Sequence, residues 1–281
     1  MSYYETYDET SRHYDHTRVA VGAEIILGCL ARQDKTLASL TVLDAGCGTG
    51  AYSQAIVGSV GRIEALDMSQ GMLDAARAKL AEPADAGRVA FHQGPITALP
   101  FEDASLDGVM INQVLHHLAD EVGTGAGADY PLHRQVLAEF ARVLRPGAGL
   151  VVNSCSREQL DGAYWYYQLA PAAKAAMIAG FVPLDDIEAI LGDVGFALSG
   201  RFVPVDGICQ GAAYFDGRGP LQKAWRDGDS FWALADEAEL ARALDLVEDL
   251  DRQGRLDGFV AKHDARRAHI GQITFLHAVR I

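Results

Sequence analysis

Short β-prone runs alternate with amphipathic helical segments between residues 40 and 155 of this 281-residue chain. Such alternation predicts βαβ units, and therefore a parallel sheet with helices on both faces. In sheets of this kind, ligands bind beyond the carboxyl ends of the strands, near the change in strand order. The first five strands are expected at 40–43, 62–66, 89–92, 106–112 and 149–153.

The pattern loosens after the fifth strand. A helix is expected at 184–191, a sixth strand at 197–205 and a last strand at 272–280. Between the last two strands, helical segments alternate with glycine-rich loops, which we interpret as an insertion that covers a site as a lid. The expected fold class is therefore α/β: a Rossmann-like, doubly wound, mostly parallel seven-stranded sheet with an N-terminal helical arm and a helical lid before the last strand.

No Pro/Ser-rich or low-complexity linker divides the chain, so a single domain over 1–281 is expected. Near its start, Val19, Ala23 and Leu30 share a helical stripe that begins at Thr17. A later helix, marked by Leu137, Phe140 and Leu144, is expected to stop at Pro146-Gly147. The expected parts are an arm or cap (1–35), the core (36–205 plus 270–281) and the lid (206–269).

The charge balance narrows the classes of partner. With 38 acidic against 24 basic residues the net charge is −14, which disfavours nucleic acid as a partner. No apolar run approaches the ~20 residues of a membrane span, and the N-terminus does not resemble a signal peptide, so no membrane partner and a cytoplasmic location are expected. The four cysteines are widely spaced without a CxxC pair, so neither a metal site nor a disulfide framework is expected. The oligomeric state is not indicated.

The glycine-rich segment 42–50 (VLDAGCGTG) carries the strongest chemical signal. Glycines at alternate positions after a strand let the backbone turn sharply and approach a ligand closely. Asp67 ends the next expected strand and suits the two hydroxyls of a ribose. An adenosine cofactor is therefore expected. A nicotinamide dinucleotide remains an alternative, although its sites favour G-x-G-x-x-G spacing rather than alternate glycines preceded by an acid.

Together with these residues, further segments that follow in the same order along the chain resemble the class I S-adenosylmethionine (SAM)-dependent methyltransferases. The resemblance is to the small-molecule branch that includes the ubiquinone-biosynthesis enzymes. The resemblance implies an enzyme that transfers a methyl group from SAM to an O, N, C or S nucleophile of a small-molecule acceptor, by in-line displacement. A non-catalytic SAM-binding or regulatory protein and a nicotinamide-dependent oxidoreductase are the alternatives. The matching segments are 43–50, 66–73, 99–107, 114–118 and 142–147, with a weaker match at 7–18.

The resemblance also implies roles for individual residues. The loop after the first strand would hold the methionine moiety, Asp67 the ribose and Met68 the adenine face. In place of the acid that the family commonly uses for the adenine amino group stands Pro95, so that contact is either lost or supplied otherwise. The cofactor-binding candidates are Asp44, Gly46, Cys47, Gly48, Asp67, Met68, Pro95, Ile96, Asn112, Tyr7 and Arg18.

Catalysis would need a base only if the acceptor must lose a proton. His117, His116 and Tyr14 are the candidates. A helix cap or packing is the alternative for the histidines, and a solvated arm is the alternative for Tyr7, Tyr14 and Arg18. The aromatic segment 164–167 and the segment 225–232 are each expected either to line an acceptor pocket or to have a structural role. The acceptor is expected to be small and weakly polar.

Overall fold

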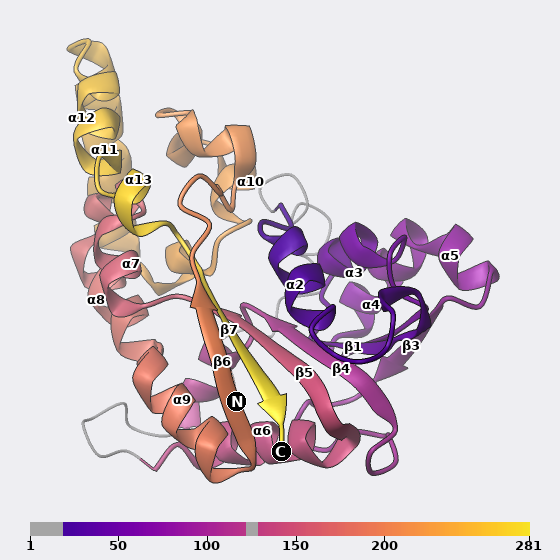
Figure 1. Cartoon of the computed structure of the whole chain (residues 1–281). Helices are drawn as coiled ribbons and strands as arrows, with labels where there is room; N and C mark the ends of the chain where they lie inside the picture. The colour runs from indigo at the N-terminus through magenta and orange to yellow at the C-terminus, as the bar shows by residue number, and fades with distance from the viewer. Residues whose placement is uncertain (1–18, 122–128) are drawn as a thin grey trace.

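The computed structural model describes residues 19–121 and 129–281. Within these ranges a seven-stranded sheet carries helices on both faces (Figure 1). The strand order is β3-β2-β1-β4-β5-β7-β6. The strands are β1 (Thr41–Ala45), β2 (Arg62–Asp67), β3 (Val89–Gln93), β4 (Leu106–Asn112), β5 (Leu144–Ser154), β6 (Phe196–Phe202) and β7 (Thr274–Arg280).

The central strands bury side chains on both faces of the sheet. Along β4, Val109 and Ile111 belong to one hydrophobic core and Met110 belongs to the other. Successive side chains of a strand point to opposite faces, so a strand between two helical layers is apolar throughout. This explains why the apolar residues Val109, Met110 and Ile111 of β4 follow one another without alternating with polar ones.

Helices supply the other half of each core. Apolar residues of α2, α3 and α4 pack in one core, and those of α6 and α9 pack in the other. In Figure 1, α11 and α12 stand away from the sheet, above α7 and α8. The helices are α2 (Ala23–Leu30), α3 (Ala51–Ile56), α4 (Gln70–Lys79), α5 (Ala81–Asp85), α6 (Pro131–Val143), α7 (Arg157–Gly162), α8 (Pro171–Gly180), α9 (Leu184–Asp193), α10 (Lys223–Arg226), α11 (Glu237–Arg252), α12 (Leu256–Asp264) and α13 (Arg267–Ile270).

Short 3₁₀ helices occupy several connections. They are η2 (Leu37–Ser39), η3 (Leu115–Glu121), η4 (Trp165–Leu169), η5 (Gly211–Phe215), η6 (Gly219–Leu221) and η7 (Ser230–Leu234). Four of these, η4 to η7, lie in the part of the chain after β5. The expected mixed α/β fold with a mostly parallel seven-stranded sheet is confirmed. The exception to parallel pairing is β7, which runs antiparallel to both β5 and β6.

The junction between α6 and β5 differs from the sequence expectation. The helix ends at Val143 and the strand begins at Leu144, so Pro146-Gly147 lies inside the strand and is not the helix stop. Leu144 already pairs with Leu106 of β4, and Arg145 forms an ion pair with Asp107. Pairing with β4 therefore begins the strand before the proline is reached.

Two other elements, a helix and a strand, are shorter than expected. The helix expected from Thr17 begins only at Ala23, because Gly22 adopts a left-handed conformation with φ 78°. Val19 is consequently outside the helix and 52% exposed. The sixth strand ends at Phe202 rather than near residue 205. Pro204 follows, and proline has no N–H to donate to a strand ladder.

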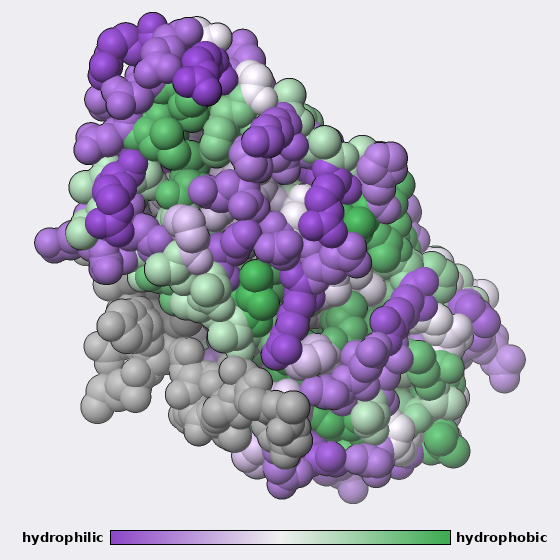
Figure 2. All heavy atoms as spheres, turned by 90° about the vertical axis from the view of Figure 1, so that its left-hand side faces the viewer, coloured by the Kyte–Doolittle hydropathy of each residue, from purple (hydrophilic) through white to green (hydrophobic). Residues whose placement is uncertain are grey.

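Figure 2 shows the side of the molecule that carries α8, α11 and α12, where hydrophobic side chains form separate patches among hydrophilic ones. Among the helices of the described ranges, none has both the length and the apolar character that crossing a membrane requires. All four cysteines are buried, and none forms a disulfide.

Candidate functional site

A cavity of about 1050 Å³ lies beyond the carboxyl ends of β1, β2 and β4. Its volume is at the upper end of the range for pockets that enclose a drug-sized ligand. One half is lined by residues that follow these three strands and by residues 94–97 after β3. The other half is lined by residues of η3, α8 and the segments 164–167 and 209–240. The cavity therefore joins the strand ends to the part of the chain expected to form a lid.

The glycine loop after β1 lies against this cavity. Gly46 has φ 73° and Gly48 has φ 53°, a region that side-chain-bearing residues rarely adopt. A Cβ on Gly46 would lie 2.7 Å from the Val114 side chain, whereas a Cβ on Gly48 would meet nothing within 4 Å. Gly46 is thus required by packing within the protein, while the space beside Gly48 is open to a ligand.

Asp67 is the last residue of β2 and is fixed by backbone donors. Its carboxylate accepts hydrogen bonds from the N–H groups of Gly48, at 2.8 Å, and Ser69, at 2.9 Å. Burial raises the pKa of this carboxyl, and the two N–H donors oppose the rise. Each oxygen keeps a further lone pair, so the side chain is oriented yet able to accept hydrogen bonds from a ligand.

Asp44 and Asn112 lie deeper, at the ends of β1 and β4. Asp44 is 1% exposed and accepts a hydrogen bond from Ser53 Oγ at 2.7 Å. Burial raises its pKa to about 7, against the lowering effect of Ser53 and the nearby Asn112 amide. Both polar atoms of that amide are buried and lack a hydrogen-bond partner of normal length among the described residues. Buried side-chain amides are rarely left without hydrogen-bond partners, which indicates that a ligand with polar groups binds at this position.

The segment after β3 forms one end of the cavity. Pro95, Ile96 and Thr97 line it, opposite Met68 and Met72. Met68 lines the cavity and is 71% exposed, so its side chain lies at the open side of this end. This end is therefore apolar on one side and offers backbone groups on the other.

Aromatic residues from several elements line the other half of the cavity. Tyr164 and Tyr167 are stacked with ring centroids 4.7 Å apart, and both face the cavity. Phe181, Met177 and Trp232 complete the apolar wall. The hydroxyl of Tyr164 donates to the backbone carbonyl of Gln272 at 3.1 Å, so its ring orientation is fixed. This half suits a molecule with a substantial apolar surface.

His116 and His117 lie at the junction of the two halves, on η3. Their ring centroids are 4.0 Å apart, and His116 stacks on Phe181 at 4.5 Å with an interplanar angle of 10°. Because both rings line the cavity, both are available to a ligand bound there. His116 thus packs on Phe181 and also lines the cavity.

Comparison with known proteins identifies the domain that builds this site. Residues 43–152 match a family model described as a methyltransferase domain. Residues 43–152 form a methyltransferase domain. A demethylmenaquinone methyltransferase of Clavibacter sepedonicus is 33% identical over 149 residues, which cover 52% of this chain and 55% of that protein. One from Lactococcus lactis is 37% identical over 127 residues, 44% of this chain and 45% of that protein. The chain thus spans about half the length of these curated relatives.

The fold is shared over a longer stretch than the sequence match. A putative methyltransferase from an antibiotic biosynthesis pathway of Anabaena variabilis superimposes with a TM-score of 0.71 and 20% identity, covering 95% of this chain and 100% of the other. The geranyl diphosphate C-methyltransferase of Streptomyces coelicolor, solved with S-adenosylhomocysteine, gives a TM-score of 0.53 at 13% identity, covering 92% and 78%. The similarity to the first of these extends well beyond the methyltransferase domain itself.

Most of the residues expected to bind the cofactor of this methyltransferase domain gather at the one cavity. The tyrosines and arginine of the N-terminal segment, Tyr7, Tyr14 and Arg18, lie outside the described residues. The expected residues that line the cavity are Asp44, Gly46, Cys47, Gly48, Asp67, Met68, Pro95, Ile96, Asn112, His116 and His117.

The aromatic segment after β5 divides between two roles. Tyr164 and Tyr167 line the cavity, whereas Trp165 and Tyr166 are fully buried in the core. Cys209 also lines the cavity, while Cys155 lies behind the wall, with its Sγ 3.8 Å from the Tyr164 hydroxyl. The division follows from the 3₁₀ geometry of η4, in which residues three apart, such as Tyr164 and Tyr167, lie on the same side.

The segment 225–232 divides in the same way. Arg226, Asp229 and Trp232 line the cavity, while Trp225 and Phe231 are buried beside it. Asp229 is 7% exposed and accepts hydrogen bonds from the Tyr166 hydroxyl and from the backbone N–H of Phe231. These bonds join the segment to η4, so it is built into the wall of the site.

One cavity residue gave no signal in the sequence. Gln113 directly follows β4 with φ 56°, an uncommon conformation for a residue with a side chain. Its side-chain amide donates to Asn153 Oδ1 at 2.9 Å, and its carbonyl oxygen lies 3.6 Å from Cys155 Sγ. Backbone strain of this kind concentrates at functional sites. Only the structure reveals it, because the sequence shows an ordinary glutamine after a strand.

Proposed function

We propose that this chain is an enzyme that transfers the methyl group of SAM to an O, N, C or S nucleophile of a small-molecule acceptor. The observation that carries the proposal is the continuity of the cavity. Residues of the methyltransferase domain form one half, and the other half includes the aromatic side chains of Tyr164, Tyr167, Phe181 and Trp232. A cofactor and an acceptor can therefore lie against each other without water between them.

The cofactor half fits the chemistry of SAM. Asp67 has lone pairs for the ribose hydroxyls, and the buried Asn112 amide lacks partners that the methionine amino and carboxylate groups would supply. The open space beside Gly48 leaves room for the cofactor backbone. Met68 and Ile96 would cover the adenine faces. When bound, SAM supplies a methyl group activated by its sulfonium centre.

The chain's own contribution to the reaction is placement and exclusion of water. Holding the acceptor atom in line with the transferring methyl group converts a bimolecular step into an effectively unimolecular one. Tyr164, Tyr167 and Phe181 would hold the acceptor body, and either histidine of the pair would accept a proton from an acceptor that must lose one. His117 is the primary candidate for this role and His116 the second.

We further propose that residues 206–269 act as the lid of a single domain spanning 1–281, with 1–35 as its arm. Support comes from Cys209, Arg226 and Leu240, which lie far apart in this segment and line the same cavity. Exclusion of water by such a cover is a common requirement in group transfer. The lid would then determine which acceptors can enter.

The acceptor is proposed to be small and weakly polar. The wall of the acceptor half includes four aromatic side chains and Met177. Of the two cations in the wall, Lys223 pairs with Asp227 at 2.6 Å, and Arg226 donates to the carbonyl of Pro220 at 2.5 Å. A multiply acidic acceptor would have to displace these contacts, which disfavours it.

The proposal is tested by incubating the protein with SAM and a panel of phenols, thiols and amines, and measuring S-adenosylhomocysteine by mass spectrometry. We expect acceptor-dependent formation of this product, and no binding of NAD in a parallel titration. Tight SAM binding without turnover on any acceptor would favour a regulatory protein. Binding of NAD in place of SAM would favour an oxidoreductase.

A further inference from the structure

The segment between β3 and β4, residues 94–105, has no sheet or helix of its own, yet its first part forms the proposed adenine end of the cavity. Pro95, Ile96 and Thr97 line that end. Among the described residues, no partner accepts a hydrogen bond from the backbone N–H of Ile96 or Thr97. The segment therefore presents free backbone donors where a ligand base would lie.

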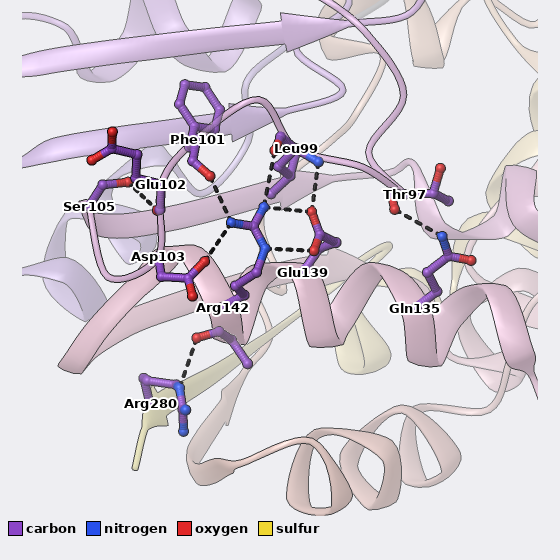
Figure 3. A network of polar contacts seen from close by, with 11 residues as sticks. Thr97, Leu99, Phe101, Glu102, Asp103, Ser105, Gln135, Glu139, Arg142 and Arg280 are labelled. Atoms are coloured by element: carbon purple, nitrogen blue, oxygen red, sulfur yellow. Dashed lines mark hydrogen bonds and ion pairs between the residues drawn. The ribbon is translucent and has the colours of Figure 1, made fainter.

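Two side chains of α6 hold this segment from below (Figure 3). Arg142 and Glu139 form a bidentate ion pair, with Nε–Oε1 at 2.7 Å and Nη2–Oε2 at 2.8 Å. Together they bind both backbone groups of Leu99. Its N–H donates to Glu139 Oε2 at 2.7 Å, and its carbonyl accepts from Arg142 Nη2 at 3.0 Å.

The same guanidinium reaches further along the segment. Arg142 Nη1 donates to the carbonyl of Phe101 at 2.7 Å and to Asp103 Oδ1 at 2.9 Å. Gln135, two turns earlier on α6, donates to the carbonyl of Thr97 at 3.0 Å. The guanidinium of arginine is planar and holds its N–H donors in fixed directions. These bonds therefore restrict both the distance and the orientation of the segment relative to α6.

At its other end the segment is tied to the ribose site. The N–H of Gly94 donates to the backbone carbonyl of Asp67 at 3.0 Å. The cavity-lining residues 95–97 thus lie between two attachment points, Asp67 on one side and the Glu139–Arg142 ion pair on the other. Their position relative to Asp67 depends on how firmly the α6 side is held.

We propose that Glu139 and Arg142 are positioning residues for the adenine of the cofactor, acting through the backbone donors at Ile96 and Thr97. The inference rests on the proposed use of SAM. It follows from Pro95, which offers the adenine neither a carboxylate nor an N–H. Recognition of the base edge then falls to the backbone beside it, and that backbone is held in place from α6.

An alternative role for the pair is purely structural, in fastening α6 to the sheet. The two roles differ in what they do to base selectivity. A backbone N–H can donate to N1 of adenine, which is an acceptor, but opposes N1 of hypoxanthine, which carries a proton. A positioned donor therefore favours adenine, while a structural fastening has no preference between the bases.

The test compares Arg142→Gln and Glu139→Gln with the unaltered chain, using calorimetric titration of S-adenosylhomocysteine and its hypoxanthine analogue. Loss of charge-assisted bonds that hold the donors should weaken binding of the adenine compound by about 5- to 30-fold. The preference for adenine over hypoxanthine should shrink in both variants. In steady-state assays KM for SAM should rise while kcat at saturating SAM stays unchanged. Arg142→Lys, which keeps the charge but loses the fork, should be intermediate.

Arg134→Gln is the matched control, because Arg134 lies on the same helix but pairs with Asp129 and Asp193. It should bind both compounds like the unaltered chain. If Arg142→Gln is poorly folded, Gln135→Ala tests the same segment through its bond to Thr97. Equal loss of both compounds, or unchanged binding, would overturn the positioning role. Failure of the unaltered chain to bind S-adenosylhomocysteine would instead overturn the proposed function.

Discussion

The Asp67 carboxylate lies 2.8 Å from the backbone nitrogen of Gly48 and accepts its hydrogen bond. The acid at the end of β2 and the glycine loop after β1 are therefore parts of one structure. Both line the cavity, and the bond holds them in a fixed relation before any ligand arrives. A change at Asp67 should consequently affect the ribose end and the methionine end of the site together.

Asp67→Ala should weaken binding of SAM and S-adenosylhomocysteine in parallel. Loss of two hydrogen bonds to the ribose should cost about 1–3 kcal/mol, or roughly 5- to 150-fold in affinity. Calorimetric titration measures both. Asp74→Ala is the control, because Asp74 is an exposed acid of α4 that pairs with Arg77. Unchanged affinity of the Asp67 variant would show that this residue is not the ribose ligand.

Gly48→Val should remove cofactor binding while leaving the fold intact. The new side chain would enter open space beside the loop rather than collide with the protein. The positive φ of residue 48 adds strain of about 1–2 kcal/mol, so a modest fall in melting temperature is expected. Circular dichroism checks the fold, and titration checks binding. Normal SAM binding by a folded variant would contradict the assignment of this loop to the cofactor.

The positions of the strands were the part of the fold that could best be predicted from the sequence. The predicted range of β4, 106–112, matches the structure, because an apolar run such as Val109-Met110-Ile111 has few other ways to be buried. The orientation of β7 carried no such signal. Whether a last strand runs parallel or antiparallel depends on the path of the segment before it, and hydrophobic patterning does not encode that path. The α6–β5 junction was misjudged because Leu144 already pairs with Leu106 of β4, while Pro146 lies in an irregular stretch before regular pairing resumes at Gly149.

The two halves of the cavity also differed in how far the sequence predicts them. Asp44, Asp67 and Asn112 each follow a strand, so the fold alone brings them to one edge of the sheet. Phe181 and Trp232 line the same cavity although they are far apart in the chain, because α8, which precedes Phe181, packs against η7. Their meeting depends on tertiary contacts that no local pattern records. The Arg142 contacts with Leu99 and Phe101 are of this second kind, because their acceptors are backbone carbonyls.

Affinity for SAM should depend on pH through Asp44, whose pKa is raised to about 7 by burial. A raised carboxyl pKa means that the folded chain holds a proton that the unfolded chain has lost between about pH 4 and 7. The unfolding free energy of the cofactor-free protein should therefore fall as pH rises across that window. A cationic ligand favours the ionised carboxylate, so SAM should bind about tenfold more weakly at pH 6 than at pH 8.

Titrations in two buffers of different ionisation enthalpy would show the accompanying release of a proton near pH 6.5. Asp44→Asn provides the control, because its side chain cannot titrate. Its SAM affinity should be lower and nearly flat between pH 6 and 8. A flat profile for the unaltered chain would contradict coupling between Asp44 and the cofactor.

The histidine pair bears on the acceptor. His116 and His117 line the cavity where its two halves meet, so either ring can reach an acceptor atom placed against the cofactor. If the acceptor must lose a proton, His117→Ala should lower kcat by roughly 10²–10⁴-fold with little change in SAM affinity. The pH–rate profile should then lose the limb that the histidine supplies. His263→Ala is the control, because His263 packs against Phe259 on α12, outside the cavity. If His116→Ala and His117→Ala both keep near-normal turnover, the acceptor reacts without a histidine base, as an ionised thiol or a thioether would.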